Sequence, residues 1–176
     1  MYKHQWVVVK ALSLLRKKGH NLSLTLVGSS NEPARSMTLN AIRESNLNAN
    51  FVEQLEFLPH DKLPDLLLKS NVFIFASSCE NMPITLLEAM ATGLPIASSN
   101  RGPMPEILQD GGVYFDPEDE VSIANAGEAL ITSKNLRLIS AEKARTLSLQ
   151  YSWQRCSYET FSYISKIYHS ATKARK

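Results

Sequence analysis

Short apolar runs alternate along the chain with longer segments in which apolar residues recur every three to four positions. The short runs have the length of strands and lie at 22–27, 51–58, 72–76, 94–98 and 113–115. The periodic segments favour helices and lie at 6–19, 34–45, 61–69, 84–92 and from 118 onward, with breaks near 133–135 and 151–153. Strands that alternate with helices predict an α/β domain, a Rossmann-like open parallel sheet with helices on both faces.

One stretch of this pattern has the layout of a binding site. The continuous apolar run 72–76 is typical of a strand buried on both faces, and a polar loop follows it. Pro83 suits the first turn of the next helix and Gly93 suits its end. Two carboxylates flank the helix start, because Glu80 lies on the loop and Glu88 lies in the second turn.

The loops that follow the strands are expected to form one cleft, because ligands of doubly wound sheets bind outside the carboxyl ends of the strands. These loops hold small or polar residues and span 28–31, 57–60, 77–82 and 98–104. Gly28 opens the first of them. At the helix start, the backbone N–H groups of Ile84 and Thr85 are expected to donate to an anion, and a phosphate is the expected ligand.

Composition narrows the class of protein. The chain has 176 residues, of which 44% are hydrophobic and 20% charged, and this predicts a single domain over 1–176. A net charge of +2 is too small to indicate a nucleic-acid partner. No apolar run reaches about 18 residues, so no bilayer span is expected, and the cytoplasm fits best.

The side chains that often bind metals or act as nucleophiles show no supporting pattern. Two distant cysteines give neither a disulfide framework nor a metal site, and Cys79 is expected to be a small buried residue. The four histidines lack ligand spacing and are expected to be polar surface residues: His4, His20, His60 and His169. We therefore expect no metal site. An aromatic stripe with helical spacing indicates packing: Trp153, Tyr158, Phe161, Ile164 and Tyr168.

Several motifs occur in an order that resembles a known family. Seven residues separate Glu80 from Glu88, and Glu-Ala-Met-Ala-x-Gly-x-Pro runs from Glu88 to Pro95. Further markers are Gly102-x-x-Pro105-Glu106, Phe57-Leu58-Pro59-His60-Asp61-Lys62-Leu63, Asp110-Gly111-Gly112 and Tyr151-Ser152-Trp153. Over nearly its whole length, the chain resembles the C-terminal, donor-binding domain of group 1 (family 4) retaining glycosyltransferases, which is one half of a GT-B fold.

The resemblance implies a role for each matching residue. Glu88 would accept hydrogen bonds from the ribose hydroxyls of a UDP-sugar or GDP-sugar, and Glu80 would address the donor sugar. Lys3 would neutralise the diphosphate as negative charge grows on the leaving group. The backbone at Asn81, Met82 and Pro83 would contact the sugar. Leu58 would contact the base. The resemblance implies a donor substrate and no cofactor.

The chain also departs from the resembled family. The family's first strand, with an arginine at its end, stands before the residue that matches Lys3, and this chain has no residues there. In the family's strand order that strand is central, so the sheet is expected to lack the strand between 22–27 and 72–76. The C-terminal helix at 153–170 is expected to pack toward an N-terminal domain that this chain lacks.

Two functions remain open on the sequence alone. One is the donor-binding part of a retaining glycosyltransferase, which acts on a glycan or lipid-linked acceptor in polysaccharide or glycoconjugate synthesis and is incomplete for turnover alone. The other is a non-catalytic nucleotide-sugar-binding or assembly subunit of a two-chain transferase. In either case, an absent N-terminal domain or a partner chain would supply the acceptor site, and peripheral association with the inner membrane face is left open.

Overall fold

A computed structural model describes residues 2–29, 31–45 and 51–173, with side chains to residue 170. Its strands are β1 (Leu24–Val27), β2 (Val52–Leu55), β3 (Phe73–Phe75), β4 (Ile96–Ser99) and β5 (Val113–Phe115). Its α-helices are α1 (Gln5–Lys17), α2 (Ala34–Glu44), α3 (Leu63–Lys69), α4 (Ile84–Thr92), α5 (Met104–Leu108), α6 (Glu120–Thr132), α7 (Lys134–Ser148) and α8 (Trp153–Lys173). This order confirms the predicted α/β class.

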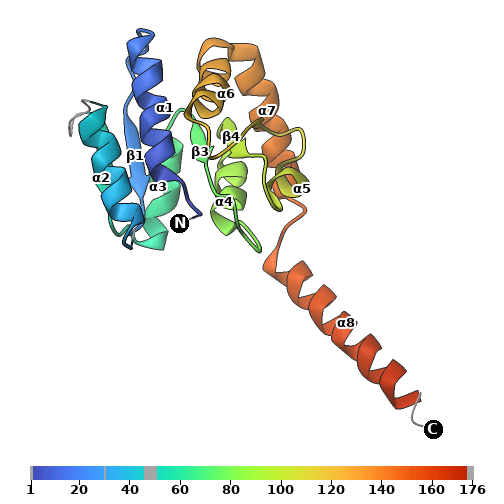
Figure 1. Ribbon diagram of the computed structural model, residues 1–176. Helices are drawn as coiled ribbons and strands as arrows, with labels where there is room; N and C mark the ends of the chain where they lie inside the picture. Colours follow the sequence, from blue (N-terminus) through green and yellow to red (C-terminus); the bar gives the residue numbers. More distant parts are fainter. Residues whose placement is uncertain (1, 30, 46–50, 174–176) are drawn as a thin grey trace.

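The strands form two parallel sheets (Figure 1). In the first sheet β1 pairs with β2, with Leu24 opposite Val52. In the second, β4 lies between β3 and β5, with Phe73 opposite Ile96. Across the described residues β1 and β3 are not paired with each other. The sheet is therefore divided at the place where the sequence predicts that a central strand is missing.

Helix α1 packs against both parts of the divided sheet. Val7 and Val8 belong to the buried cluster around β4 and α6, whereas Val9 and Leu12 belong to the cluster that holds Leu26 of β1. Valine is enriched in strands, but these three adjacent valines lie in a helix. The helix lets them contribute to both clusters. The helix ends with Arg16 and Lys17, and basic side chains at a helix C-terminus are favourable.

Helix α4 begins and ends as the sequence predicts. Pro83 precedes it, and Gly93 closes it in the left-handed conformation with φ 73°, donating its N–H to the Met90 carbonyl. Leu86, Ala89 and Met90 have no exposed surface, and burying such a leucine stabilises the fold by about 2 kcal/mol. This buried face joins the cluster that holds Ile96 of β4 and Ala144 of α7, and so fixes the position of Glu88.

Strand β2 is shorter than predicted, because it ends at Leu55. Phe57 and Leu58 lie in the loop that leads to the short 3₁₀ helix η1 (His60–Lys62), and the Phe57 side chain is 80% exposed. The apolar pattern alone does not distinguish this exposed loop from a strand.

Helix α8 extends away from the rest of the chain (Figure 1). The prediction that its aromatic stripe is packed is not met by the described residues, because Trp153 is 78% exposed and Phe161 68% exposed. Within residues 2–29, 31–45 and 51–173, no helix is both long and apolar enough to cross a bilayer.

Candidate functional site

The segment before α1 lies against the loop after β3. The Ser78 N–H donates to the Tyr2 carbonyl at 2.8 Å, and the Lys3 ammonium forms an ion pair with the Glu80 carboxylate. The Lys3 side chain is half exposed, whereas that of Glu80 is 15% exposed. The two residues that the sequence predicts as catalytic are thus in direct contact, although they are 77 positions apart.

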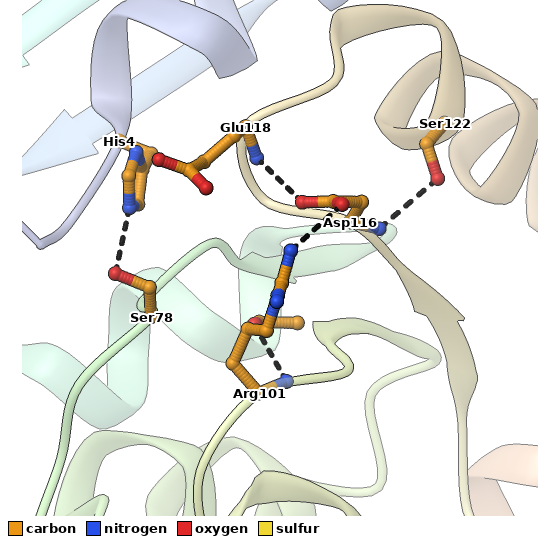
Figure 2. A network of polar contacts seen from close by, with 7 residues as sticks. His4, Ser78, Arg101, Asp116, Glu118 and Ser122 are labelled. Atoms are coloured by element: carbon orange, nitrogen blue, oxygen red, sulfur yellow. Dashed lines mark hydrogen bonds and ion pairs between the residues drawn. The ribbon is translucent and has the colours of Figure 1, made fainter.

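His4 is buried, with 6% of its surface exposed, so the prediction of a surface histidine is wrong at this position. Its Nε2 is 2.8 Å from Ser78 Oγ (Figure 2). Burial lowers the pKa of His4, and the nearby carboxylates of Glu118 and Asp116 oppose that shift only partly. The sequence carries no signal for this role, because Ser78 is 74 positions away.

Glu88 projects from the second turn of α4 toward η1. Its Oε1 lies 2.6 Å from Nε2 of His60, with the Glu88 side chain 25% exposed and that of His60 85% exposed. His60 was not among the predicted site residues. Its position in the loop after β2, one of the loops expected to line the cleft, is the signal that could have identified it.

The loop between Glu80 and α4 presents mostly exposed residues: Asn81, Met82, Ile84 and Thr85. Pro83 differs from them, because it is fully buried and has no N–H to donate. The Ile84 N–H donates to the Met82 carbonyl at 2.9 Å, so this donor is used within the loop. Pro83 therefore shapes the loop, and its own side chain faces the core.

The other two predicted contacts lie on the β1–β2 part of the molecule. Gly28 has φ 105°, a conformation that glycine adopts at no steric cost, and its N–H donates to the Leu55 carbonyl at 2.9 Å. Leu58 is partly buried in the loop after β2. Both residues follow the carboxyl ends of their strands, as predicted.

A cavity of about 170 Å³ lies between the start of α1 and the loop after β1. Its lining includes Lys3, Trp6, Ser29 and Asn31, so it combines one cation with polar and aromatic groups. A larger open hollow of about 380 Å³ beside α7 is lined by none of the predicted site residues. The smaller cavity thus places Lys3 beside polar groups of the loop after β1.

An ion pair joins the loops after β4 and β5, and hydrogen bonds order the loop after β5 and tie it to α6 (Figure 2). The Arg101 guanidinium contacts Asp116 Oδ2 at 2.9 Å, and the Asp116 N–H donates to Ser122 Oγ at 3.0 Å. The Glu118 N–H donates to Asp116 Oδ1 at 3.1 Å. These contacts hold the loop that carries Glu118 beside His4.

The structure also places the two kinds of side chain that often bind metals or act as nucleophiles. Cys79 is exposed, so the expectation of a small buried residue is wrong. In the part of the chain that the structure describes, no group of three or more His, Cys, Asp or Glu side chains is placed to hold a metal ion.

Comparisons with known proteins bear on this arrangement. A sequence model of the family "Glycosyl transferases group 1" matches residues 1–147. The O-antigen chain mannosyltransferase B of Escherichia coli is 27% identical over 119 residues, which is 68% of this chain and 31% of that protein. A phosphatidylinositol N-acetylglucosaminyltransferase subunit from Arabidopsis thaliana is 28% identical over 129 residues, which is 72% of this chain and 28% of that protein. The chain thus spans less than a third of the length of these relatives.

Solved structures show the same fold. Anabaena HepE in complex with UDP and glucose superposes with a TM-score of 0.82 at 20% identity, over 94% of this chain and 45% of that one. The C-terminal domain of the Francisella tularensis group 1 glycosyl transferase LpcC superposes with a TM-score of 0.74 at 19% identity, over 85% of this chain and 79% of that one. With the match of the family model over residues 1–147, the conclusion is that this chain belongs to the group 1 glycosyl transferases and has the architecture of one half of a GT-B fold.

Proposed function

We propose that this chain is the donor-binding part of a retaining glycosyltransferase that takes a sugar from a UDP-sugar or GDP-sugar. The observation that carries the proposal is the grouping of one cation and two carboxylates around the loop that leads into α4. Lys3 contacts Glu80 on that loop, and Glu88 follows on the helix. A nucleotide sugar needs both kinds of group, because its diphosphate is anionic and its hydroxyls donate hydrogen bonds.

In this proposal Glu88 holds the ribose. An ionised carboxylate accepts two hydrogen bonds in parallel, which suits the neighbouring 2′ and 3′ hydroxyls. Its Oε1 contacts His60 at 2.6 Å in the structure, so the ribose would either share the carboxylate with that imidazole or displace it. Leu58 and Gly28, at the ends of the two neighbouring strands, would lie toward the base.

Lys3 would act on the diphosphate. Its ammonium has three N–H donors, so it can keep its contact with Glu80 and still donate to a phosphate oxygen. As the bond between sugar and phosphate breaks, negative charge grows on the departing phosphate, and a cation already in place lowers the energy of that state. Glu80 would orient Lys3 and accept from a sugar hydroxyl, with the backbone at Asn81 and Met82 and the N–H of Thr85 nearby.

The names of similar proteins support this substrate class. The E. coli relative is a mannosyltransferase of the O-antigen chain, the A. thaliana relative belongs to an N-acetylglucosaminyltransferase of phosphatidylinositol, and HepE was solved with UDP and glucose. A glycan or lipid-linked acceptor is accordingly part of the proposal, as is a cytoplasmic location with peripheral association at the membrane. An N-terminal domain or partner chain would supply the acceptor site, so turnover is proposed only for the larger assembly.

The divided sheet favours a second candidate, a non-catalytic nucleotide-sugar-binding or assembly subunit of a two-chain transferase. The break between β1 and β3 lies beside the segment that carries Lys3. If that break persists in the assembly, the phosphate side of the site would bind without promoting transfer. Transfer assays on the assembly separate the two candidates, because only the first predicts loss of turnover on Lys3→Met.

Calorimetric titration tests the proposed function. UDP-glucose and GDP-mannose are titrated into the wild-type chain, Glu88→Ala and the control Glu142→Ala, which removes an exposed glutamate on α7. Hydrogen bonds to a charged group contribute about 1.5–3 kcal/mol, so Glu88→Ala should weaken the better ligand about 10- to 100-fold and Glu142→Ala should not. Equal affinity in wild type and Glu88→Ala would refute the ribose role.

A further inference from the structure

His4 has a backbone conformation that residues other than glycine seldom adopt. Its φ is 42° and ψ is 33°, in the left-handed region that glycine and asparagine adopt most readily. Such a conformation persists only where surrounding contacts hold it in place, and it tends to occur at functional sites. The contacts of His4 should therefore show what this conformation achieves.

The hydrogen bond of the His4 side chain is made to Ser78, in the loop after β3. His4 Nε2 lies 2.8 Å from Ser78 Oγ, and the Ser78 N–H donates to the Tyr2 carbonyl at 2.8 Å. The residues on either side of Lys3 are thus both bound to Ser78, which lies two positions before Glu80. Figure 2 shows the imidazole of His4 directed at the Ser78 hydroxyl.

The backbone of His4 also starts α1. Its carbonyl accepts from the N–H of Val7 at 3.0 Å and of Val8 at 3.3 Å. One residue therefore ends the segment that carries Lys3, begins the helix that packs on both sheets, and contacts the loop that carries Glu80. The left-handed turn at His4 is what lets its side chain meet Ser78 while its carbonyl caps the helix.

Charged groups from another element also face His4. Glu118 and Asp116, from the loop after β5, favour the protonated imidazole, whereas burial disfavours it more strongly and lowers the pKa of His4. The neutral imidazole has one N–H and one acceptor nitrogen, and the Ser78 hydroxyl can serve either. His4 thus contacts the loop after β3 and lies near the loop after β5, and both strands belong to the second sheet.

We propose that His4 is a positioning residue that, through Ser78, holds the Lys3 ammonium against the Glu80 carboxylate. The purpose assigned to Lys3, contact with the donor diphosphate, rests on the proposed function, but the positioning itself requires no ligand. Lys3 is half exposed, so without this anchor its ammonium would sample many rotamers in solvent.

Nuclear magnetic resonance of the free chain tests the positioning. The ¹³C signal of the Glu80 carboxyl is compared with and without Lys3→Met, in the wild-type, His4→Gly and Ser78→Ala backgrounds. His4→Gly suits the left-handed backbone and removes only the side chain, so the turn that begins α1 is kept. Lys3→Met should shift the Glu80 signal in the wild-type background. In the His4→Gly and Ser78→Ala backgrounds, the shift caused by Lys3→Met should be less than half as large. An equal shift in all three backgrounds would overturn the proposal.

Ser78→Thr and Ser78→Ala form a matched pair for rescue, because threonine keeps the hydroxyl and alanine does not. Calorimetry with the better nucleotide sugar should give Ser78→Ala and His4→Gly about 3- to 10-fold weaker affinity, and Ser78→Thr affinity within about twofold of wild type, as expected for one hydrogen-bonded anchor. If Ser78→Thr binds the nucleotide sugar as weakly as Ser78→Ala does, the proposed role of the Ser78 hydroxyl as an anchor is contradicted.

The two measurements fail separately. If wild type binds no nucleotide sugar, the proposed function fails while the Glu80 signal still decides the positioning. If wild type binds but the effect of Lys3→Met on Glu80 is the same in every background, the positioning alone fails.

Discussion

The two sheets differ in how deeply they are buried, although both are parallel and both are covered by helices. All four residues of β4 are buried, whereas in β1 only Leu26 is. Glu80 and Glu88 belong to the deeply buried part, while Gly28, Leu58 and His60 belong to the thinner one. The candidate site therefore depends on two parts of unequal burial and on helix α1, which packs against both.

The largest expected effect compares two leucines. Leu86 of α4 is fully buried in the larger part, and Leu26 of β1 is 6% exposed in the smaller one. Leu86→Ala should lower the free energy of unfolding by about 4 kcal/mol and Leu26→Ala by about 2.5 kcal/mol, because a rigid, fully enclosed site collapses less around the cavity. Urea denaturation measures both. A larger loss in Leu26→Ala than in Leu86→Ala would reverse the comparison.

A smaller effect should appear as a pH dependence of stability. The pKa of His4 is lowered by burial in the folded state, so its neutral form is favoured there. Stability from this group is present above the ordinary histidine pKa and is lost as pH falls through the folded value. Melting temperatures of wild type should therefore fall more steeply below about pH 6.5 than those of His4→Gly. Parallel curves for the two proteins would show that His4 does not titrate as described.

The smallest expected effect concerns the ion pair between α1 and α6. Hydrogen bonds from Lys18 and then His20 lower the pKa of Glu128, so this carboxylate stabilises the fold above its unfolded pKa and less as pH falls through its folded value. Lys18 is exposed and Glu128 and His20 are partly exposed, and salt screens such pairs. Glu128→Gln should slightly lower the melting temperature at low salt, and the difference from wild type should vanish at about 1 M salt. A difference that survives at that salt concentration would mean that the pair is more shielded than the structure shows.

Local chemistry made much of the site predictable. Pro83 and Gly93 mark the ends of α4 by backbone preferences that need no tertiary information, and the apolar run before Glu80 predicts β3 in the same way. Once these elements are placed, the rule for carboxyl ends of parallel strands selects the loops that carry the candidate site.

The features that escaped prediction depend on contacts between distant residues. His4 is buried because Ser78, 74 positions away, meets its imidazole. Phe57 has an apolar side chain but lies in an exposed loop, and the stripe on α8 predicts an apolar face without saying what covers it. The family is thus carried by local motifs, whereas the contacts that join the two sheets are not.

The most direct test of the central claim uses a ligand that lacks the groups assigned to Glu88. UDP or GDP, whichever binds, is compared with its 2′,3′-dideoxy form in wild type and in Glu88→Gln by calorimetry. Wild type should favour the complete nucleotide by about tenfold or more, and Glu88→Gln should favour neither, because the ribose hydroxyls would have lost their charged acceptor. The same preference in both proteins, or no binding by wild type, would contradict the account.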